Sequence, residues 1–181
     1  MEIRTEHRSA LVIGATGGIG GETATALLEH GWSVRALTRD VARAERDFAR
    51  LGAVQWVRGD AMRDSDVVAA ARGTHLIVHA ANPPGYRHWR ALALPMLDNT
   101  IAAARANGAR VVLPGNVYNF GPDAGAVVAE NAPQHPQTRK AKCGSRWRRC
   151  YGPPRLTACV RSWCAPAITS GHTGQARGSA M

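Results

Sequence analysis

This 181-residue chain has no cysteine before residue 143, no acidic residue after Glu130 and no long apolar run. All four cysteines follow residue 142, so the first 142 residues hold neither a disulfide framework nor a cysteine-based metal site. No run of about 18 apolar residues occurs, which argues against a membrane-spanning helix. The first eight residues also lack the apolar core of a signal peptide. We therefore expect a cytoplasmic protein with no membrane partner.

Acidic residues are absent after Glu130, and this absence divides the chain by charge. Residues 1–130 contain 14 Lys and Arg and 13 Asp and Glu, whereas residues 131–181 contain nine basic residues. Nearly all of the net charge of +10 therefore comes from the C-terminal part. We predict an ordered domain at 1–142 and a basic, poorly ordered tail at 143–181.

A glycine-rich turn stands between a strand-like and a helix-like segment near the N-terminus. It reads Gly14, Ala15, Thr16, Gly17, Gly18, Ile19, Gly20. In this context Gly14 permits a tight turn, Gly17 leaves room for a pyrophosphate, and Gly20 lets the helix pack close to the strand. The helix N-terminus offers free N–H groups to the phosphates. The pattern predicts a dinucleotide phosphate site; the alternative is an ordinary glycine-rich turn.

Strand-like and helix-like segments alternate through the first 115 residues. Short apolar runs predict strands at 10–13, 33–37, 54–57, 75–79 and 110–113. Helical patterns lie between them at 18–30, 41–50, 64–72 and 88–107. Pro95 either kinks the last helix or marks its true start. The alternation predicts an α/β fold, a Rossmann-type doubly wound parallel sheet that is incomplete on its C-terminal side.

The end of the second predicted strand bears on the choice of cofactor. An acidic residue about 20 positions after the glycines holds the ribose 2′-OH in NAD-selective folds. Thr38 occupies that place, and Arg39 follows it. A cation suits a 2′-phosphate, so we predict NADP, with NAD as second choice. The alternative is that Arg39 is a surface charge paired with Asp40.

The ends of later strands supply further candidate contacts. Asp60 and Ala61 follow the third strand, where a carboxylate can accept a hydrogen bond from the adenine amino group or cap the next helix. Ala80, Ala81 and Asn82 follow the fourth strand, and small residues there let a flat cofactor lie against the backbone.

These motifs together resemble the NAD(P)-dependent epimerase/dehydratase group of the extended and atypical short-chain dehydrogenases. The resemblance covers about residues 9–142 and rests mainly on the glycine loop and on the segment Gly115–Pro122. It implies an NAD(P)-binding Rossmann domain, a smaller C-terminal substrate domain, and hydride transfer at an alcohol or carbonyl carbon. The family often has an asparagine at the position of Asn99, and related enzymes often form homodimers through helices at 88–107 and 140–155.

The predicted cofactor contacts are Gly14, Ala15, Thr16, Gly17, Gly18, Ile19, Gly20, Thr38, Arg39, Asp60, Ala61, Ala80, Ala81, Asn82, Asn99 and Asn116.

The catalytic pattern departs from that of the family. Typical members use a Tyr-x-x-x-Lys pair, in which the lysine lowers the pKa of the tyrosine that acts as general base. Thr138 holds the tyrosine position and Lys142 the lysine position, while Asn116 stands where a Ser or Thr orients the substrate. Tyr118 is either a substitute proton donor or a residue that supports the cofactor or packs in its loop.

The tail has three interpretations. It is a basic nucleic-acid arm, a metal site on its four cysteines and His172, or a segment translated out of frame. We favour the third, because every Cys and Trp codon begins with TG and a one-base shift restores Leu, Val or Met. Cys143, Trp147 and Cys150 then become apolar at helical spacing. We expect nucleic-acid binding to be absent.

The sequence thus predicts an NAD(P)-dependent oxidoreductase or epimerase-like protein that acts on a small polar, sugar-like substrate. The alternative is a non-catalytic, NADP-binding redox-sensing regulator, which the missing tyrosine favours. Turnover of NADPH with a carbonyl substrate separates the two.

Overall fold

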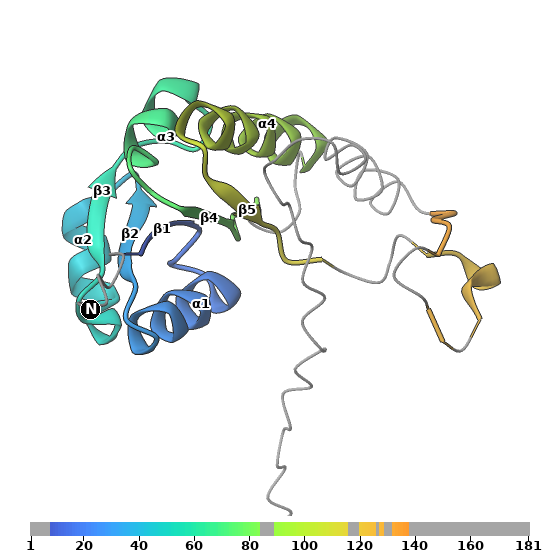
Figure 1. Cartoon of the computed structure of the whole chain (residues 1–181), viewed down its shortest axis with the longest axis horizontal. Coiled ribbons are helices and arrows are strands. Elements are labelled where there is room, and N and C mark those ends of the chain that lie inside the picture. Colours follow the sequence, from blue (N-terminus) through green and yellow to red (C-terminus); the bar gives the residue numbers. More distant parts are fainter. Residues whose placement is uncertain (1–7, 84–88, 116–119, 126, 129–131, 138–181) are drawn as a thin grey trace, which may run out of the picture.

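A single parallel sheet organises the chain in the computed structural model, which describes residues 8–83, 89–115, 120–125, 127–128 and 132–137. Its strand order is β3-β2-β1-β4-β5, and every neighbouring pair is parallel (Figure 1). The strands are β1 Ser9–Ile13, β2 Ser33–Thr38, β3 Gln55–Arg58, β4 Leu76–His79 and β5 Arg110–Val112.

The central strand β1 is buried along its whole length, as its apolar run predicts. Ile13, its last residue, pairs with Leu37 of β2 on one side and with His79 of β4 on the other. The carboxyl ends of these three strands therefore meet at one edge of the sheet. The strand order reverses at β1, and in open α/β sheets that reversal opens a crevice outside the strand ends.

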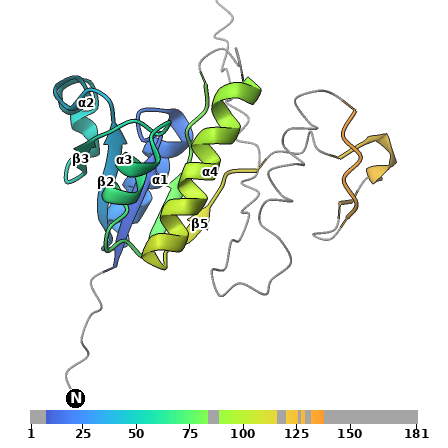
Figure 2. The same cartoon turned by 90° about the horizontal axis from the view of Figure 1, so that it is seen from above.

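Helices cover both faces of the sheet. They are α1 Gly18–Glu29, α2 Val41–Asp47, α3 Asp64–Ala70 and α4 Trp89–Asn107, with short 3₁₀ turns η1 Ala49–Leu51 and η3 Pro122–Ala124. α3 and α4 lie on one face and α1 and α2 on the other (Figures 1 and 2). Right-handed crossovers produce this arrangement, because the chain reverses its direction of travel across the sheet after β3. The predicted doubly wound α/β fold is confirmed.

Two apolar cores result from these layers. Leu11, Ile13 and Ile77 point to the α3–α4 face and pack with Val67 of α3. Alternate strand residues point to the other face, where they meet α1 and η1: Val12, Val34, Ala36 and Val78. β1 thus contributes side chains to both cores, so a polar side chain in its interior would be buried on either face.

The predicted helices are all present, with differences at their ends. α2 ends at Asp47, before the predicted residue 50, because the chain tightens there into η1. Pro95 lies inside α4 and does not mark its start. The tail at 143–181 lies outside the described residues. Within the described part, no helix has the length and apolar character needed to cross a bilayer.

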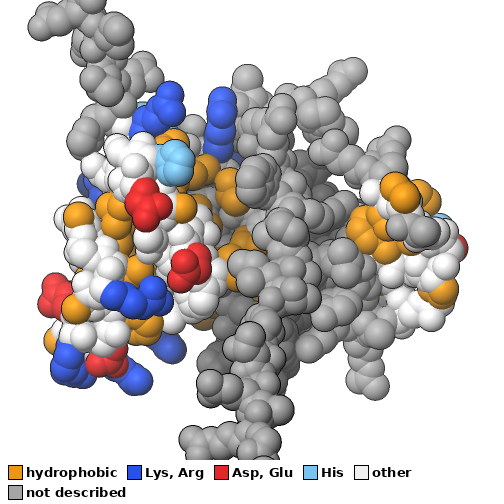
Figure 3. Space-filling model, turned by 90° about the horizontal axis from the view of Figure 1, so that it is seen from below, with side chains coloured by type: hydrophobic (Ala, Val, Ile, Leu, Met, Phe, Trp, Pro, Cys, Tyr) orange, Lys and Arg blue, Asp and Glu red, His pale blue; other side chains and the backbone are white. Residues whose placement is uncertain are grey.

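Charge on the described domain is mixed, as the near balance of residues 1–130 predicts. The face in Figure 3 carries basic and acidic side chains next to one another. Mixed signs at short spacing largely cancel beyond a Debye length of about 10 Å.

Arg35 joins β2 to the end of α3. Its Nη1 donates to the carbonyl oxygens of Ala70 and Arg72, at 3.2 and 2.7 Å. The last carbonyls of a helix have no partner within the helix, and a cation near them also interacts favourably with the helix dipole. Arg35 therefore caps α3 from a neighbouring strand.

We predict that Arg35→Ala lowers the free energy of unfolding by about 1–3 kcal/mol, since it leaves two helix-end carbonyls without their charged donor. Urea denaturation followed by circular dichroism measures the change. Arg105→Ala removes an exposed arginine from α4 and is the matched control, with an expected change within about 0.5 kcal/mol. Equal losses in the two variants would contradict the capping role.

Candidate functional site

The glycine loop is held in place by close backbone contacts. Gly14 has φ +95°, a conformation that side-chain-bearing residues rarely adopt, and a Cβ there would lie 2.6 Å from the backbone of Ala80 and Ala81. A Cβ on Gly20 would lie 2.6 Å from the carbonyl carbon of Gly14 and closer still to its oxygen. These two glycines let β1, β4 and α1 meet without side chains between them.

Gly17 lies at the N-cap of α1 and faces outward. Its N–H donates to the Gly14 carbonyl at 3.0 Å, and no side chain caps the helix. An added Cβ would find only the Gly14 oxygen at 3.4 Å, an ordinary contact. The fold itself therefore has room for a Cβ at Gly17. The first-turn N–H groups of α1, which have no partner within the helix, are available to an anion above the loop.

A cleft of about 840 Å³ opens over this loop at the carboxyl ends of the strands. Most of the predicted cofactor residues line it: Gly14, Thr16, Gly17, Gly18, Ile19, Thr38, Arg39, Asp60, Ala61, Ala80, Ala81 and Asn82. Ala15 and Gly20 are buried beneath the loop and do not line the cleft. Ile19 is 59% exposed, an unusual state for an isoleucine, and it presents apolar surface at the cleft.

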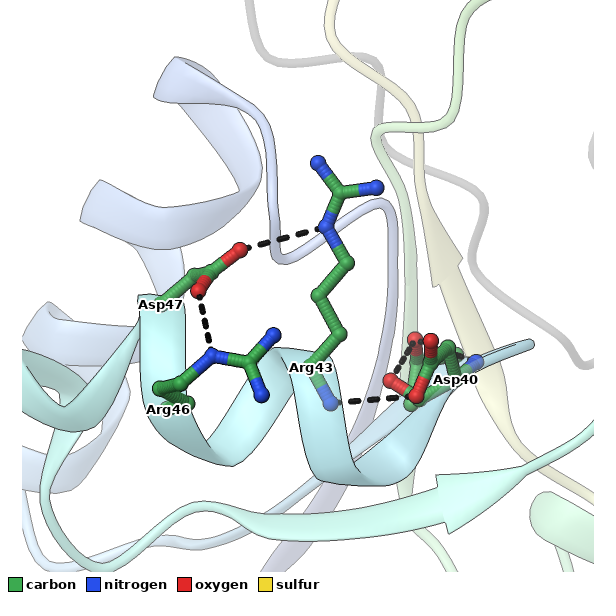
Figure 4. Close-up of polar contacts among 5 residues, drawn as sticks. Asp40, Arg43, Arg46 and Asp47 are labelled. Carbon is green, nitrogen blue, oxygen red and sulfur yellow. Dashed lines mark hydrogen bonds and ion pairs between the residues drawn. The ribbon is translucent and has the colours of Figure 1, made fainter.

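The β2 side of the cleft carries the residues that bear on cofactor choice. Asp40 caps α2 by accepting the Arg43 N–H at 3.0 Å, and Arg43 Nε binds Asp47 at 3.1 Å (Figure 4). Among the residues that the structure describes, no ion pair joins Arg39 to Asp40. Arg39 is exposed and lies at the cleft, and its role in cofactor choice stays a prediction.

The corner after β3 is shaped by two carboxylates. Asp66 Oδ2 accepts the Asp60 N–H at 2.9 Å, and Asp60 Oδ1 accepts the Met62 N–H at 2.9 Å. Asp60 thus folds its own turn, while the N-cap of α3 is Arg63. The alternative in which Asp60 caps the next helix is wrong.

Asn99 lies on α4, outside the lining of the cleft. Its Nδ2 donates to the carbonyl of Ala61, which does line the cleft, at 2.9 Å. Asn99 therefore ties α4 to the corner after β3, and no cofactor contact through its side-chain amide is evident from this geometry.

His79 is the last residue of β4 and is 1% exposed. Burial lowers the pKa of His79 from its ordinary value of 6.5 to about 4, since the charged imidazolium loses its hydration. Its Nδ1 lies 2.8 Å from Thr100 Oγ1 on α4. A neutral histidine thus stands directly below the residues that form the floor of the cleft.

The predicted catalytic residues Tyr118, Thr138 and Lys142 lie outside the described residues, as does Asn116. The structure therefore leaves the roles of these four residues as predictions.

The sequence did not predict several of the residues that line the cleft: Leu37, Arg43, Phe48, Met62, Leu92 and Met96. Leu92 and Met96 are spaced i, i+4 on α4, which reads as a core-facing pattern. Met62, 39% exposed, follows Asp60 and Ala61 and was open to inference from its neighbours. Phe48 comes from the end of α2, and only the tertiary fold places it at the cleft.

A family model described as NAD(P)H-binding matches residues 14–140, which includes the glycine loop and every strand after β1. The chain belongs to the NAD(P)H-binding family. This match supports an NAD(P)-binding function for the domain that contains the cleft. No curated protein matches the chain.

Several solved structures share the fold of this NAD(P)H-binding domain. UDP-N-acetylglucosamine 4-epimerase from Bacillus cereus is 15% identical, with TM-score 0.66, over 86% of this chain and 58% of its own. Uronate dehydrogenase from Agrobacterium tumefaciens is 23% identical, with TM-score 0.61, over 80% and 56%. The Bordetella bronchiseptica enzyme WbmG in complex with NAD and UDP is 15% identical, with TM-score 0.64, over 79% and 48%. The chain thus spans less than three fifths of each.

We predict that Gly20→Ala lowers the free energy of unfolding by about 3 kcal/mol, because its Cβ would overlap the Gly14 carbonyl. Gly18→Ala is the matched control, since a Cβ there meets nothing within 4 Å. It should change stability by less than about 1 kcal/mol, within the range of helix propensity. Thermal denaturation compares the two, and a stable Gly20→Ala would contradict the close contact.

The pKa of His79 predicts how stability depends on pH. The folded-state value of about 4 lies below the unfolded value, so unfolding takes up a proton between them. The buried, neutral His79 therefore contributes about 3 kcal/mol to the free energy of unfolding above pH 6.5. This contribution is lost as the pH falls toward 4. Urea denaturation at pH 7 and pH 4.5 measures this loss. His79→Asn should show a smaller difference between the two pH values, and an unchanged difference would refute the assignment.

Proposed function

We propose that this chain binds NADP(H) in the cleft and forms the cofactor-binding part of an oxidoreductase or epimerase. The observation that carries the proposal is Arg39, an exposed guanidinium at the cleft directly after β2. That position adjoins the ribose of a dinucleotide whose pyrophosphate lies on the glycine loop.

Two further features favour a 2′-phosphate over a 2′-hydroxyl. Thr38 stands where NAD-selective folds place a carboxylate, and its Oγ1 already contacts the backbone of Asp40. The Asp40 carboxylate is engaged at the N-cap of α2. The bond from Arg43 to Asp47 uses Nε and leaves the terminal nitrogens of Arg43 outside it (Figure 4). Arg43 lines the same cleft as Arg39.

The cofactor supplies a hydride to, or accepts one from, an alcohol or carbonyl carbon when it is bound. Tyr118 is proposed as the proton donor, while Thr138 and Lys142 occupy the tyrosine and lysine positions of the family's Tyr-x-x-x-Lys pair. Asn116 is proposed to orient the substrate hydroxyl.

A small polar, sugar-like substrate is supported by the names of the structures that share the fold, an N-acetylglucosamine epimerase and a uronate dehydrogenase. Those proteins are longer than this chain, which spans 58% and 56% of them. We propose that residues 143–181 are translated out of frame and that the restored frame continues the substrate-binding half.

A non-catalytic redox sensor is the second candidate, and Thr138 at the tyrosine position favours it. The two functions share the cofactor and differ in turnover. Consumption of NADPH with a panel of sugar aldehydes and ketoses, followed at 340 nm, supports the enzyme; tight binding without turnover supports the sensor.

We predict that Arg39→Ala weakens NADPH binding by about 10- to 100-fold, the loss expected for one charge-assisted hydrogen bond to phosphate. NADH binding should stay within about twofold, because NADH lacks the 2′-phosphate. Enhancement of the nicotinamide fluorescence gives both dissociation constants.

Arg46→Ala is the matched control: Arg46 is exposed on α2, the helix that follows Arg39, binds Asp47, and does not line the cleft. It should leave both dissociation constants unchanged. An equal effect of Arg39→Ala on NADPH and NADH would refute the NADP preference, and no binding of either nucleotide would refute the proposed function itself.

A further inference from the structure

Two hydrogen bonds tie α4 to the rest of the cleft, and a third within α4 continues one of them. His79 Nδ1 meets Thr100 Oγ1 at 2.8 Å, Thr100 Oγ1 meets the Met96 carbonyl at 2.9 Å, and Asn99 Nδ2 meets the Ala61 carbonyl at 2.9 Å. We call these five residues the α4 latch. Ala61 and Met96 line the cleft themselves, and His79 directly precedes lining residues.

The direction of the hydrogen bond between His79 Nδ1 and Thr100 Oγ1 depends on where the Thr100 hydroxyl proton lies. Thr100 has one hydroxyl proton, and we assign it to the Met96 carbonyl at 2.9 Å, which can only accept, and not to His79 Nδ1. The hydroxyl then receives the proton of His79 Nδ1, which requires a neutral imidazole with its hydrogen on Nδ1. Thr100 is 0% exposed, so no bulk water competes for this chain of donors.

The latch lies where α4 needs an anchor. Pro95 has no N–H and cannot bond the carbonyl of Ala91 one turn earlier, so the first part of the helix lacks one internal restraint. Met96, whose carbonyl receives the Thr100 hydroxyl, follows at once. Leu92 and Met96, on either side of Pro95, both face the cleft.

We propose that the His79–Thr100 pair is a positioning device for the cofactor site. The pair fixes α4 against the end of β4, and Asn99 fixes the same turn of α4 against the corner after β3. Together these contacts keep α4 at the distance from the strand ends that a bound dinucleotide requires. The inference rests on the proposed binding of a dinucleotide in this cleft. Loss of the pair lowers the fraction of molecules whose cleft is competent, so the apparent dissociation constant rises by the same factor.

Thr100→Val tests the pair, because valine keeps the shape of threonine and removes the hydroxyl. We expect the dissociation constant of NADPH to rise about five- to tenfold, and Thr100→Ser, which keeps the hydroxyl, to stay near the wild-type value. Val111→Ala is the control for general destabilisation, since Val111 is buried in β5 away from the cleft. It should lower the melting temperature without changing the dissociation constant.

His79 offers a second, independent comparison. The Asn side-chain amide reaches the position of Nδ1, whereas the Gln amide reaches that of Nε2. His79→Asn should therefore retain more NADPH affinity than His79→Gln. Nitrogen-15 NMR of the wild-type imidazole should find the proton on Nδ1, and this signature needs no cofactor.

The outcomes separate the two proposals. If the wild-type chain binds neither dinucleotide, the proposed function fails and the positioning role fails with it. If it binds NADPH and Thr100→Val binds equally well, or Val111→Ala binds as weakly as Thr100→Val, the positioning role alone is overturned. A proton on Nε2 with a bare Nδ1 would overturn the latch geometry.

Discussion

The close approach of three backbone segments at Gly14 sets the geometry of everything around the cleft. β1 ends there, β4 passes within contact distance at Ala80 and Ala81, and α1 returns over the same point at Gly20. No side chain fits between these segments, so the helix axis points its first N–H groups over the strand ends. The cleft, its floor and its anion-binding rim all depend on this contact. Moving any one of the three segments outward would separate the rim from the floor.

Much of the fold was predictable because the physical signals were local. Each strand is a short apolar run, and each helix carries a stop signal near its end, such as Asn107-Gly108 after α4. The ends of the elements were less predictable, because neighbouring residues decide how a helix is capped. η1 forms where the pattern of α2 ends, and the N-cap of α3 is Arg63 although three acidic or hydroxyl residues follow it.

The candidate site divides in the same way. Its backbone part was predicted from the glycine spacing, and Arg39 from its distance to the glycines. Phe48 and Arg43 were missed because they reach the cleft from α2 only after that helix packs against the sheet. The roles of Asp60 and Asn99 required the structure, since a sequence shows the donor and acceptor groups without their partners. The catalytic residues stay predictions, because they lie outside the described part of the chain.

Gly14, Ala80 and Ala81 form a floor of the cleft that consists of peptide groups and small side chains. Every amino acid carries the same peptide group, so most positions of such a site can drift provided that the few small residues persist. This explains in physical terms how a chain only 15% identical to an epimerase from Bacillus cereus keeps the same fold with TM-score 0.66. A sequence of this architecture can therefore change at most positions while the close backbone approach at Gly14 and Gly20 persists.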